Sequence, residues 1–245
     1  MDNLNTYDYD SVIPSDLKRN NIIMVGRARD RLKRFDLGVR SMKSIIEEIP
    51  NCIMNIISLP SQKLEKLINT LELDKNIKFI GFLKDPSTFY KNSSLHIMPS
   101  LTESYAMVLA EAKVFGIPSI ICGLDYLSLA KGGTVILYDD EPEVIAKEAI
   151  KILKNNTYRQ KLGKEARESM KIKKNKFIVK KWINLLLSVN NGEEYYNKLA
   201  KNTEKISKEE YDIILKNQLN LLKKRRQIFR AKSLQRLNSL LLHNF

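Results

Sequence analysis

Two carboxylates, Glu103 and Glu111, flank the apolar segment that follows Ser100. If the chain is helical from Ser104 onward, these carboxylates return to nearly the same helix face about two turns apart, roughly 12 Å along the axis. The start of a helix presents unpaired N–H groups and the positive end of its dipole, which suit a phosphate. The spacing predicts a ligand with phosphates at the helix start and hydroxyls on the carboxylates. The alternative is an ordinary amphipathic helix with one capping Glu and one surface Glu.

The composition is that of a soluble globular protein. The chain has 245 residues, 43% of them hydrophobic and 29% charged, which allows one or two domains. No apolar run reaches the length of a membrane span, and the acidic N-terminus is unlike a signal peptide, so we expect a cytoplasmic protein. Cys52 and Cys122 lie in apolar runs and are expected to be reduced core thiols. The histidines are His96 and His243, so no metal-ligand spacing exists, and His96 is expected to be structural.

The formal net charge of +14 is uneven, because the charges of residues 1–140 cancel and the whole excess lies after residue 140. This distribution suits an anionic small-molecule ligand plus a basic tail better than a nucleic acid. The chain also lacks an aromatic-bearing RNA motif and a helix-turn-helix pattern. No G-x-G-x-x-G or P-loop follows any expected strand, which disfavours a dinucleotide-dependent oxidoreductase.

Strands and helices alternate along the chain. Short apolar runs predict buried strands over 21–26, 52–58, 77–81, 95–98, 118–123 and 134–138. Helical periodicity predicts helices over 36–49, 61–71, 86–92, 141–153, 158–171 and 174–189, in addition to the helix from Ser104.

Repeated βα units predict a Rossmann-like parallel sheet of about six strands with helices on both faces. Ligands of such sheets bind beyond the carboxyl ends of the strands, at the point where the strand order reverses. Arg27, the 82–85 loop and Glu103 all follow strands and are expected to converge there. We expect residues 21–190 to form this domain, with an extension or linker over 1–20 and a basic helical tail over 191–245.

Several short motifs together resemble the donor-binding half of family 4 glycosyltransferases, which are retaining enzymes with the two-domain GT-B architecture. The resemblance covers about residues 20–190. It is carried, in order, by Gly26-Arg27 with Lys33, Phe79-Ile80-Gly81, Met98-Pro99-Ser100, Glu103 with Glu111, Gly116-Ile117-Pro118 and Gly132-Gly133.

The resemblance implies a role for each charged motif residue in transferring a hexose-type sugar from a nucleotide-sugar. Arg27 and Lys33 match the basic pair at the donor diphosphate, where fixed cations stabilise the negative charge that grows on the departing group, with no metal or other cofactor needed. Glu103 matches the carboxylate that binds sugar hydroxyls, and Glu111 the one that accepts hydrogen bonds from the ribose. A solvated basic loop is the alternative for the cations.

The remaining contacts that the resemblance implies are made largely by the main chain. One loop meets the nucleobase and consists of Phe82, Leu83 and Lys84. A second set contacts the sugar and the distal phosphate through backbone amides and consists of Ser104, Tyr105, Ala106, Met107 and Val108. Gly26 completes the donor-binding residues.

The chain departs from the family pattern at two places. Ser58-Leu59-Pro60-Ser61 stands where the family has a glycine-rich turn. More importantly, only about twenty residues precede the first strand, fewer than a domain needs, so we expect the acceptor-binding Rossmann domain to lie outside this sequence. The partner is then another part of a longer protein or another chain, and the isolated chain is expected to have weak or no transferase activity. The alternative function is a non-catalytic nucleotide-sugar-binding or scaffold fragment that needs a partner domain.

The segment after about residue 195 has three interpretations. Ser207-Lys208-Glu209-Glu210 is typical of a capping box that opens a long helix, and Lys223-Lys224-Arg225-Arg226 interrupts its apolar positions. We favour packing on the missing domain, then a solvated extension, and last a peripheral contact with a membrane surface.

Overall fold

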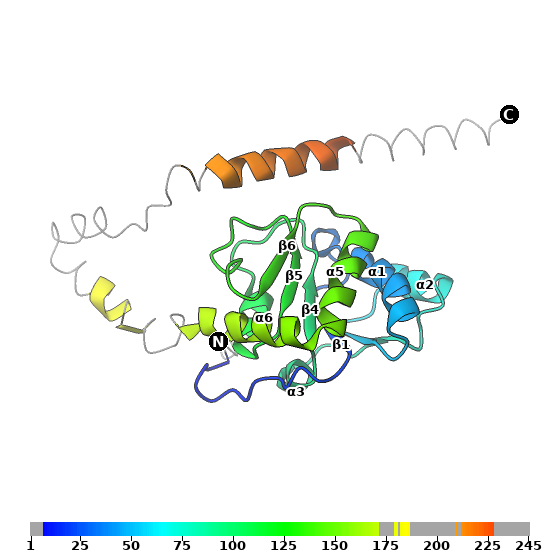
Figure 1. Cartoon of the computed structure of the whole chain (residues 1–245), viewed down its shortest axis with the longest axis horizontal. Helices are drawn as coiled ribbons and strands as arrows, with labels where there is room; N and C mark the ends of the chain where they lie inside the picture. Colours follow the sequence, from blue (N-terminus) through cyan, green and yellow to red (C-terminus); the bar gives the residue numbers. More distant parts are fainter. Residues whose placement is uncertain (1–6, 172–178, 181, 187–208, 210–211, 228–245) are drawn as a thin grey trace. The chain divides into compact units, whose positions relative to one another are not determined.

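The computed structural model describes residues 7–171, 179–180, 182–186, 209 and 212–227 (Figure 1). The chain divides into two compact units, residues 1–203 and 204–245. The domain boundary predicted at residue 190 lies outside the described residues. Within the described part of the chain, no helix has the length and hydropathy that crossing a membrane requires.

A single parallel sheet of six strands forms the centre of the first unit, and all six predicted strands are confirmed. The strand order is β3-β2-β1-β4-β5-β6, so the order reverses between β1 and β4. That reversal is the switch point at which such sheets bind ligands. The strands are β1 Asn21–Val25, β2 Ile53–Ile57, β3 Ile77–Phe79, β4 Leu95–Met98, β5 Ser119–Cys122 and β6 Thr134–Leu137.

Among residues 7–171, the helices lie within two residues of their predicted bounds, except at the start of α4. They are α1 Phe35–Glu48, α2 Gln62–Thr70, α3 Ser87–Lys91, α4 Met107–Val114, α5 Pro142–Lys154 and α6 Asn156–Ser169, with a short 3-10 helix at Arg31–Lys33. Helix α6 begins two residues early because the Asn155 side chain accepts a hydrogen bond from the Tyr158 N–H at 2.9 Å. Two further helices were predicted, over 174–189 and from Ser207 onward. Their described residues are helical, namely 179–180 and 182–186 in the first and 209 and 212–227 in the second. The remainder of both lies outside the described residues.

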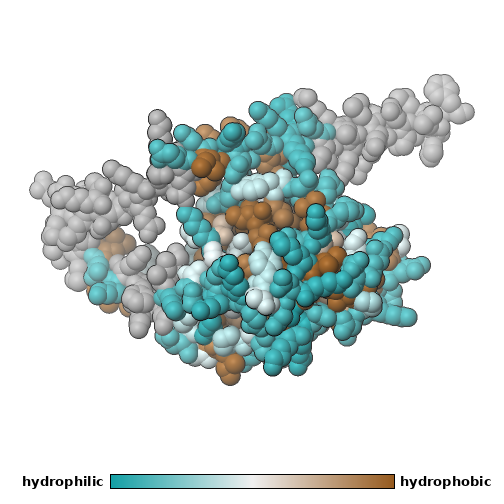
Figure 2. Space-filling model, in the orientation of Figure 1, coloured by the Kyte–Doolittle hydropathy of each residue, from teal (hydrophilic) through white to brown (hydrophobic). Residues whose placement is uncertain are grey.

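Alternate strand residues pack on opposite faces of the sheet. Ile22 and Met24 of β1 belong to a buried cluster with residues of α1, α2 and α5, whereas Ile23 packs with Tyr90 of α3 and Phe115 after α4. Both faces are therefore covered, which explains why the strands read as continuous apolar runs. Hydrophilic side chains cover much of the surface in Figure 2, and a hydrophobic patch lies in the middle of the face shown.

The segment ahead of β1 packs along the domain. The Ser15 N–H donates to the Phe115 carbonyl at 2.9 Å. From α6, the Arg167 guanidinium donates to the carbonyls of Tyr9, Val12 and Val114, and it also lies over the Tyr9 ring. These bonds join residues 9–15 to α6 and to the end of α4.

The turn before β6 packs directly against two helices. Lys113 of α4 is fully buried, and its Nζ donates to the carbonyls of Lys131 and Gly132 at 2.6 and 2.8 Å. Burial lowers the pKa of Lys113 to about 8. On the other side of the turn, a Cβ at Gly133 would lie 2.2 Å from the Leu162 carbonyl oxygen of α6. Helix α6 can approach this closely only because residue 133 has no side chain.

The C-terminus of α2 offers a test of backbone strain. Glu72 has φ +56°, and the bonds from the N–H groups of Glu72 and Leu73 to the carbonyls of Asn69 and Ile68 form a Schellman motif. Because glycine adopts this conformation without strain, we expect Glu72→Gly to raise the free energy of unfolding by about 1 kcal/mol. Lys66→Gly, at an exposed position inside α2, should lower it by about 1 kcal/mol. Urea denaturation of both variants checks this, and a destabilised Glu72→Gly would contradict it.

Candidate functional site

The carboxyl ends of β1 and β4 bring two of the predicted site residues together at the switch point. The Lys33 Nζ lies 2.6 Å from Oε1 of Glu103, and the side chains are 23% and 11% exposed. The Leu101 N–H donates to the Leu32 carbonyl at 2.7 Å, so a backbone bond joins the same two loops. A cation and a carboxylate, 70 residues apart in sequence, therefore share one half-buried position.

The helix that follows Glu103 begins later than predicted. Ala106 has φ +64° and ψ +64°, and α4 starts at Met107. The prediction of a helix from Ser104 is wrong, because a left-handed residue interrupts the chain before the first turn. The Ala106 carbonyl accepts from the N–H groups of Leu109 and Ala110. The amides of Met107 and Val108 stand at the helix start, where the helix supplies no acceptor. Ser104 and Tyr105 lie in an exposed loop.

The backbone of Glu103 is held by a tyrosine from the loop after β5. The Glu103 N–H donates to the Tyr126 hydroxyl oxygen at 3.2 Å, and that hydroxyl donates to the Glu103 carbonyl at 3.1 Å. Farther along, Tyr138 donates to Asp125 at 2.8 Å. Tyr126 was not among the predicted site residues, because nothing local to residue 126 shows that its loop returns to the end of β4.

The second carboxylate, Glu111, lies in α4 and pairs with a buried hydroxyl. Tyr90 of α3 donates to Oε2 of Glu111 at 2.7 Å. Burial raises the pKa of Glu111, while the hydrogen bond from Tyr90 lowers it. Burial and the nearby Glu111 charge hold the pKa of Tyr90 far above its ordinary value, so this hydroxyl remains a proton donor.

The other cations of the loop after β1 lie in different surroundings. The Arg27 side chain is 84% exposed, and its guanidinium lies 3.4 Å from Asp30, so no contact joins it to Glu103 or Glu111. Arg34 is not a solvated loop residue, because its guanidinium lies 2.9 Å from Asp140 and both side chains are largely buried. This pair ties the loop after β1 to the loop after β6.

The loops after β2 and β3 complete this edge of the sheet. Phe82 is 81% exposed, Lys84 is exposed, and Leu83 packs partly against the sheet. In the turn where the family pattern has glycines, the Ser58 hydroxyl accepts from the Ala28 N–H at 2.9 Å. Gly26 donates its N–H to the Ile57 carbonyl at 3.3 Å, and these two bonds join the ends of β1 and β2.

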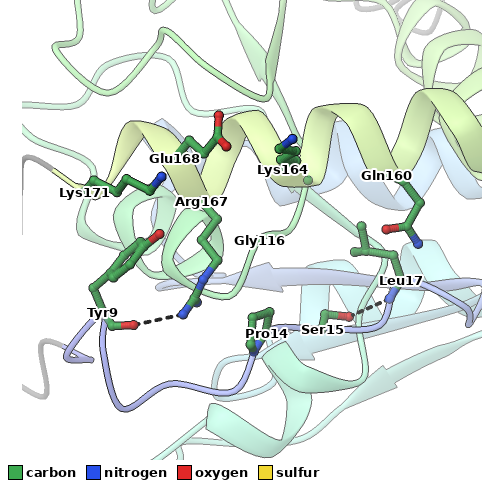
Figure 3. Close-up of a pocket in the computed structure, with 11 residues that line it drawn as sticks. Tyr9, Pro14, Ser15, Leu17, Gly116, Gln160, Lys164, Arg167, Glu168 and Lys171 are labelled. Carbon is green, nitrogen blue, oxygen red and sulfur yellow. Dashed lines mark hydrogen bonds between the residues drawn. The ribbon is translucent and has the colours of Figure 1, made fainter.

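A pocket of about 290 Å³ lies elsewhere, between α6 and the segment ahead of β1 (Figure 3). Leu17 and Gly116 line it, and they precede β1 and β5, so the pocket is at the amino ends of the strands. We place the functional site at the carboxyl ends instead, because the paired Lys33 and Glu103 and the free start of α4 meet there.

His96 lies in β4, close to the site in sequence, but it is a core residue. It is fully buried, its Nδ1 lies 3.2 Å from the Ser119 hydroxyl oxygen, and burial lowers its pKa to about 3. Cys52 and Cys122 are buried free thiols, as expected.

The depressed pKa of His96 predicts acid sensitivity. Below pH 6.5 the unfolded chain binds a proton at this residue, while the folded protein stays neutral until about pH 3. The free energy of unfolding should therefore fall by about 1.4 kcal/mol for each pH unit below 6.5 through this group. Urea denaturation of wild type and His96→Gln at pH 7.5 and 5.0 measures it. The wild type should lose about 2 kcal/mol more than the variant, and equal losses would contradict the prediction.

Known proteins resemble this chain in sequence and in fold. The model of the family "Glycosyl transferases group 1" matches residues 8–169. An uncharacterized glycosyltransferase from Haemophilus influenzae is 27% identical over 106 residues, which are 42% of this chain and 30% of that protein. The match thus spans less than a third of that relative's length.

Solved structures agree on the fold. The C-terminal domain of the glycosyl transferase group 1 family protein LpcC from Francisella tularensis matches with a TM-score of 0.56 and 15% identity, covering 66% of this chain and 95% of that domain. The pneumococcal O-GlcNAc transferase GtfA, solved with UDP and GlcNAc, matches with a TM-score of 0.65 and 18% identity, covering 74% of this chain and 38% of GtfA. The described domain therefore has the fold of the C-terminal half of a GT-B enzyme.

Proposed function

The chain belongs to the glycosyl transferases group 1 family, and from that premise we propose that its switch-point site binds a UDP-sugar as the donor half of a retaining glycosyltransferase. The observation that carries the proposal is the Lys33–Glu103 pair. It lies beyond the carboxyl ends of the neighbouring strands β1 and β4, next to the start of α4. A cation, a carboxylate and free amides in one place match a ligand that carries both phosphates and hydroxyls. The choice of uridine rests on the UDP bound to GtfA.

Each part of the donor has a proposed partner. Lys33 binds the diphosphate, and Arg27 joins it by turning from Asp30, for which its exposure leaves room. Glu103 accepts hydrogen bonds from the sugar, and Glu111 from the ribose. The amides of Met107 and Val108 meet the distal phosphate, and the loop from Phe82 to Lys84 meets the base. Ser104, Tyr105 and Ala106 line the loop beside the sugar.

The proposed reaction needs no nucleophile from this chain. The bond between the anomeric carbon and the diphosphate oxygen breaks, and the acceptor oxygen bonds to that carbon on the same face. The acceptor proton leaves with the diphosphate. Lys33 and Arg27 stabilise the negative charge of the departing group, which is the largest contribution that this half can make.

A partner must hold the acceptor, and exposed apolar side chains indicate where it docks. Within residues 7–171, the large hydrophobic residues that are exposed include one from the loop after each of the six strands. The only other one in this range is Ile13, and the six are Leu32, Leu59, Phe82, Tyr105, Tyr126 and Tyr138. Because the carboxyl ends of parallel strands share one edge, these six surround the site. We propose that the acceptor-binding domain, from the same protein or another chain, covers this edge.

Calorimetric titration of the full chain tests donor binding. UDP-GlcNAc and UDP-glucose should bind, and GDP-mannose should bind more weakly. An absence of binding by every nucleotide-sugar at millimolar concentration would overturn the proposal. A transfer assay with the chain alone should show little or no turnover, because donor and acceptor must share a closed cleft. Efficient transfer by the chain alone would remove the need for a partner.

A further inference from the structure

We propose that Tyr90 is a positioning residue that fixes Glu111 to recognise the donor ribose, so that this hydroxyl decides how strongly the site distinguishes a ribonucleotide from a deoxyribonucleotide. The inference rests on the proposed function, because it assigns the ribose to Glu111. It adds a residue from α3 that touches no part of the donor.

Tyr90 bonds one of the two oxygens of the Glu111 carboxylate. Tyr90 donates to Oε2 of Glu111 at 2.7 Å, and no other hydrogen bond to this carboxylate is present among the described residues. A carboxylate has two acceptor oxygens. With Oε2 bonded to Tyr90, Oε1 is the oxygen that can accept from a ribose hydroxyl. The bond between Tyr90 and Oε2 fixes the plane of the carboxylate and so sets the direction in which Oε1 points.

Two aromatic rings hold the side chain of Tyr90 in place. Tyr90 is fully buried, and its ring stacks on Phe115 with centroids 5.1 Å apart and planes 14° apart. Tyr7 meets the same ring edge-on, with centroids 6.1 Å apart. Because two aromatic rings hold Tyr90, its hydroxyl cannot follow a rotating carboxylate. Glu111 must instead come to the hydroxyl, which orders a side chain that otherwise has several rotamers.

The consequence concerns specificity rather than affinity alone. A hydrogen-bond acceptor that is already oriented favours a ligand with a hydroxyl over the same ligand without it. Without Tyr90 the carboxylate has both oxygens available and no fixed direction. The gain from the ribose hydroxyl then falls, whereas binding of a deoxy analogue, which never used that bond, changes little.

The test compares UDP with 2′-deoxy-UDP and 3′-deoxy-UDP by titration calorimetry on the full chain. The wild type should prefer UDP over at least one analogue by about tenfold or more. Tyr90→Phe keeps the stacked ring and removes the hydroxyl, and it should reduce that preference to about threefold or less. Tyr7→Phe is the matched control, because it removes a hydroxyl from the same aromatic cluster that donates to Asp85 and not to Glu111. It should retain the wild-type preference for UDP over the deoxy analogues.

The outcomes separate this inference from the proposed function. If Tyr90→Phe retains the wild-type preference, Tyr90 is a packing residue and the inference fails, while donor binding stands. If the wild type binds UDP and both analogues equally, the assignment of the ribose to Glu111 fails. If the wild type binds no nucleotide, both proposals fail. A thermal melt of each variant, with Tyr90→Phe still folded at the assay temperature, ensures that a lost preference is not lost structure.

Discussion

Replacing Glu103 with Ala should weaken binding of UDP-GlcNAc by about 10- to 100-fold and leave binding of UDP unchanged or slightly tighter. The loss follows because the carboxylate is proposed to accept hydrogen bonds from sugar hydroxyls, which UDP lacks. The gain for UDP follows from the 2.6 Å pair with Lys33, since the ammonium must leave Glu103 before it can turn to a diphosphate. Removing Glu103 releases that ammonium in advance.

Lys33→Ala should behave differently, weakening UDP and UDP-GlcNAc by similar factors, because both ligands carry the diphosphate. Titration calorimetry of the full chain with both ligands measures the two patterns. Lys43→Ala, at an exposed position on α1, is the control for a general loss of positive charge and should bind both ligands like the wild type. Equal weakening of UDP and UDP-GlcNAc by Glu103→Ala would show that Glu103 does not face the sugar.

Gly133→Ala should lower the free energy of unfolding by more than about 3 kcal/mol, the largest stability effect that we expect of a single methyl group in this domain. The added Cβ would lie 2.2 Å from the Leu162 carbonyl oxygen and 2.4 Å from the Ala166 nitrogen. Both atoms belong to the backbone of α6, so the helix must move away from the sheet to make room. The φ of +63° adds strain for any residue with a side chain.

Gly81→Ala separates these two causes. Gly81 also has a positive φ, +89°, but a Cβ there has no neighbour within 4 Å. This variant should therefore lose about 1 kcal/mol from backbone strain alone. Urea denaturation of both proteins measures the difference. A Gly133→Ala protein as stable as Gly81→Ala would mean that the α6 backbone leaves room for a Cβ at residue 133.

Local sequence features predicted most of the fold. Each strand is a short apolar run because both faces of the sheet are covered, and a stretch such as 21–25 can be recognised without knowing its neighbours. The helix ends were also close, since Pro142 and similar residues mark them locally. The start of α4 was missed because a left-handed Ala106 carries no local mark, unlike a glycine.

The site was predicted only as far as motifs reach. Arg27, the 82–85 loop and Glu103 were expected to converge at the switch point. Of the two motif cations, Lys33 contacts Glu103, whereas Arg27 pairs with Asp30. Arg34–Asp140 and Tyr90–Glu111 were not anticipated, because they join residues that are brought together by the strand order, which periodicity does not specify. Lys113 is a similar case, since a lysine inside a helix suggests an exposed face, whereas its ammonium is satisfied by two carbonyls of a distant turn.

The segment from Tyr7 to Leu17 determines where this domain can be cut or grafted. Tyr7 lies edge-on to Phe115 with centroids 4.9 Å apart, and the carbonyls of Tyr9 and Val12 receive the Arg167 guanidinium. A truncation immediately before β1 would expose the buried rings of Tyr90 and Phe115. It would also leave the Arg167 guanidinium without two of its hydrogen-bond acceptors. A fusion protein that adds a domain ahead of this one should therefore join it before Tyr7. Residues 7–17 then remain packed on the sheet domain.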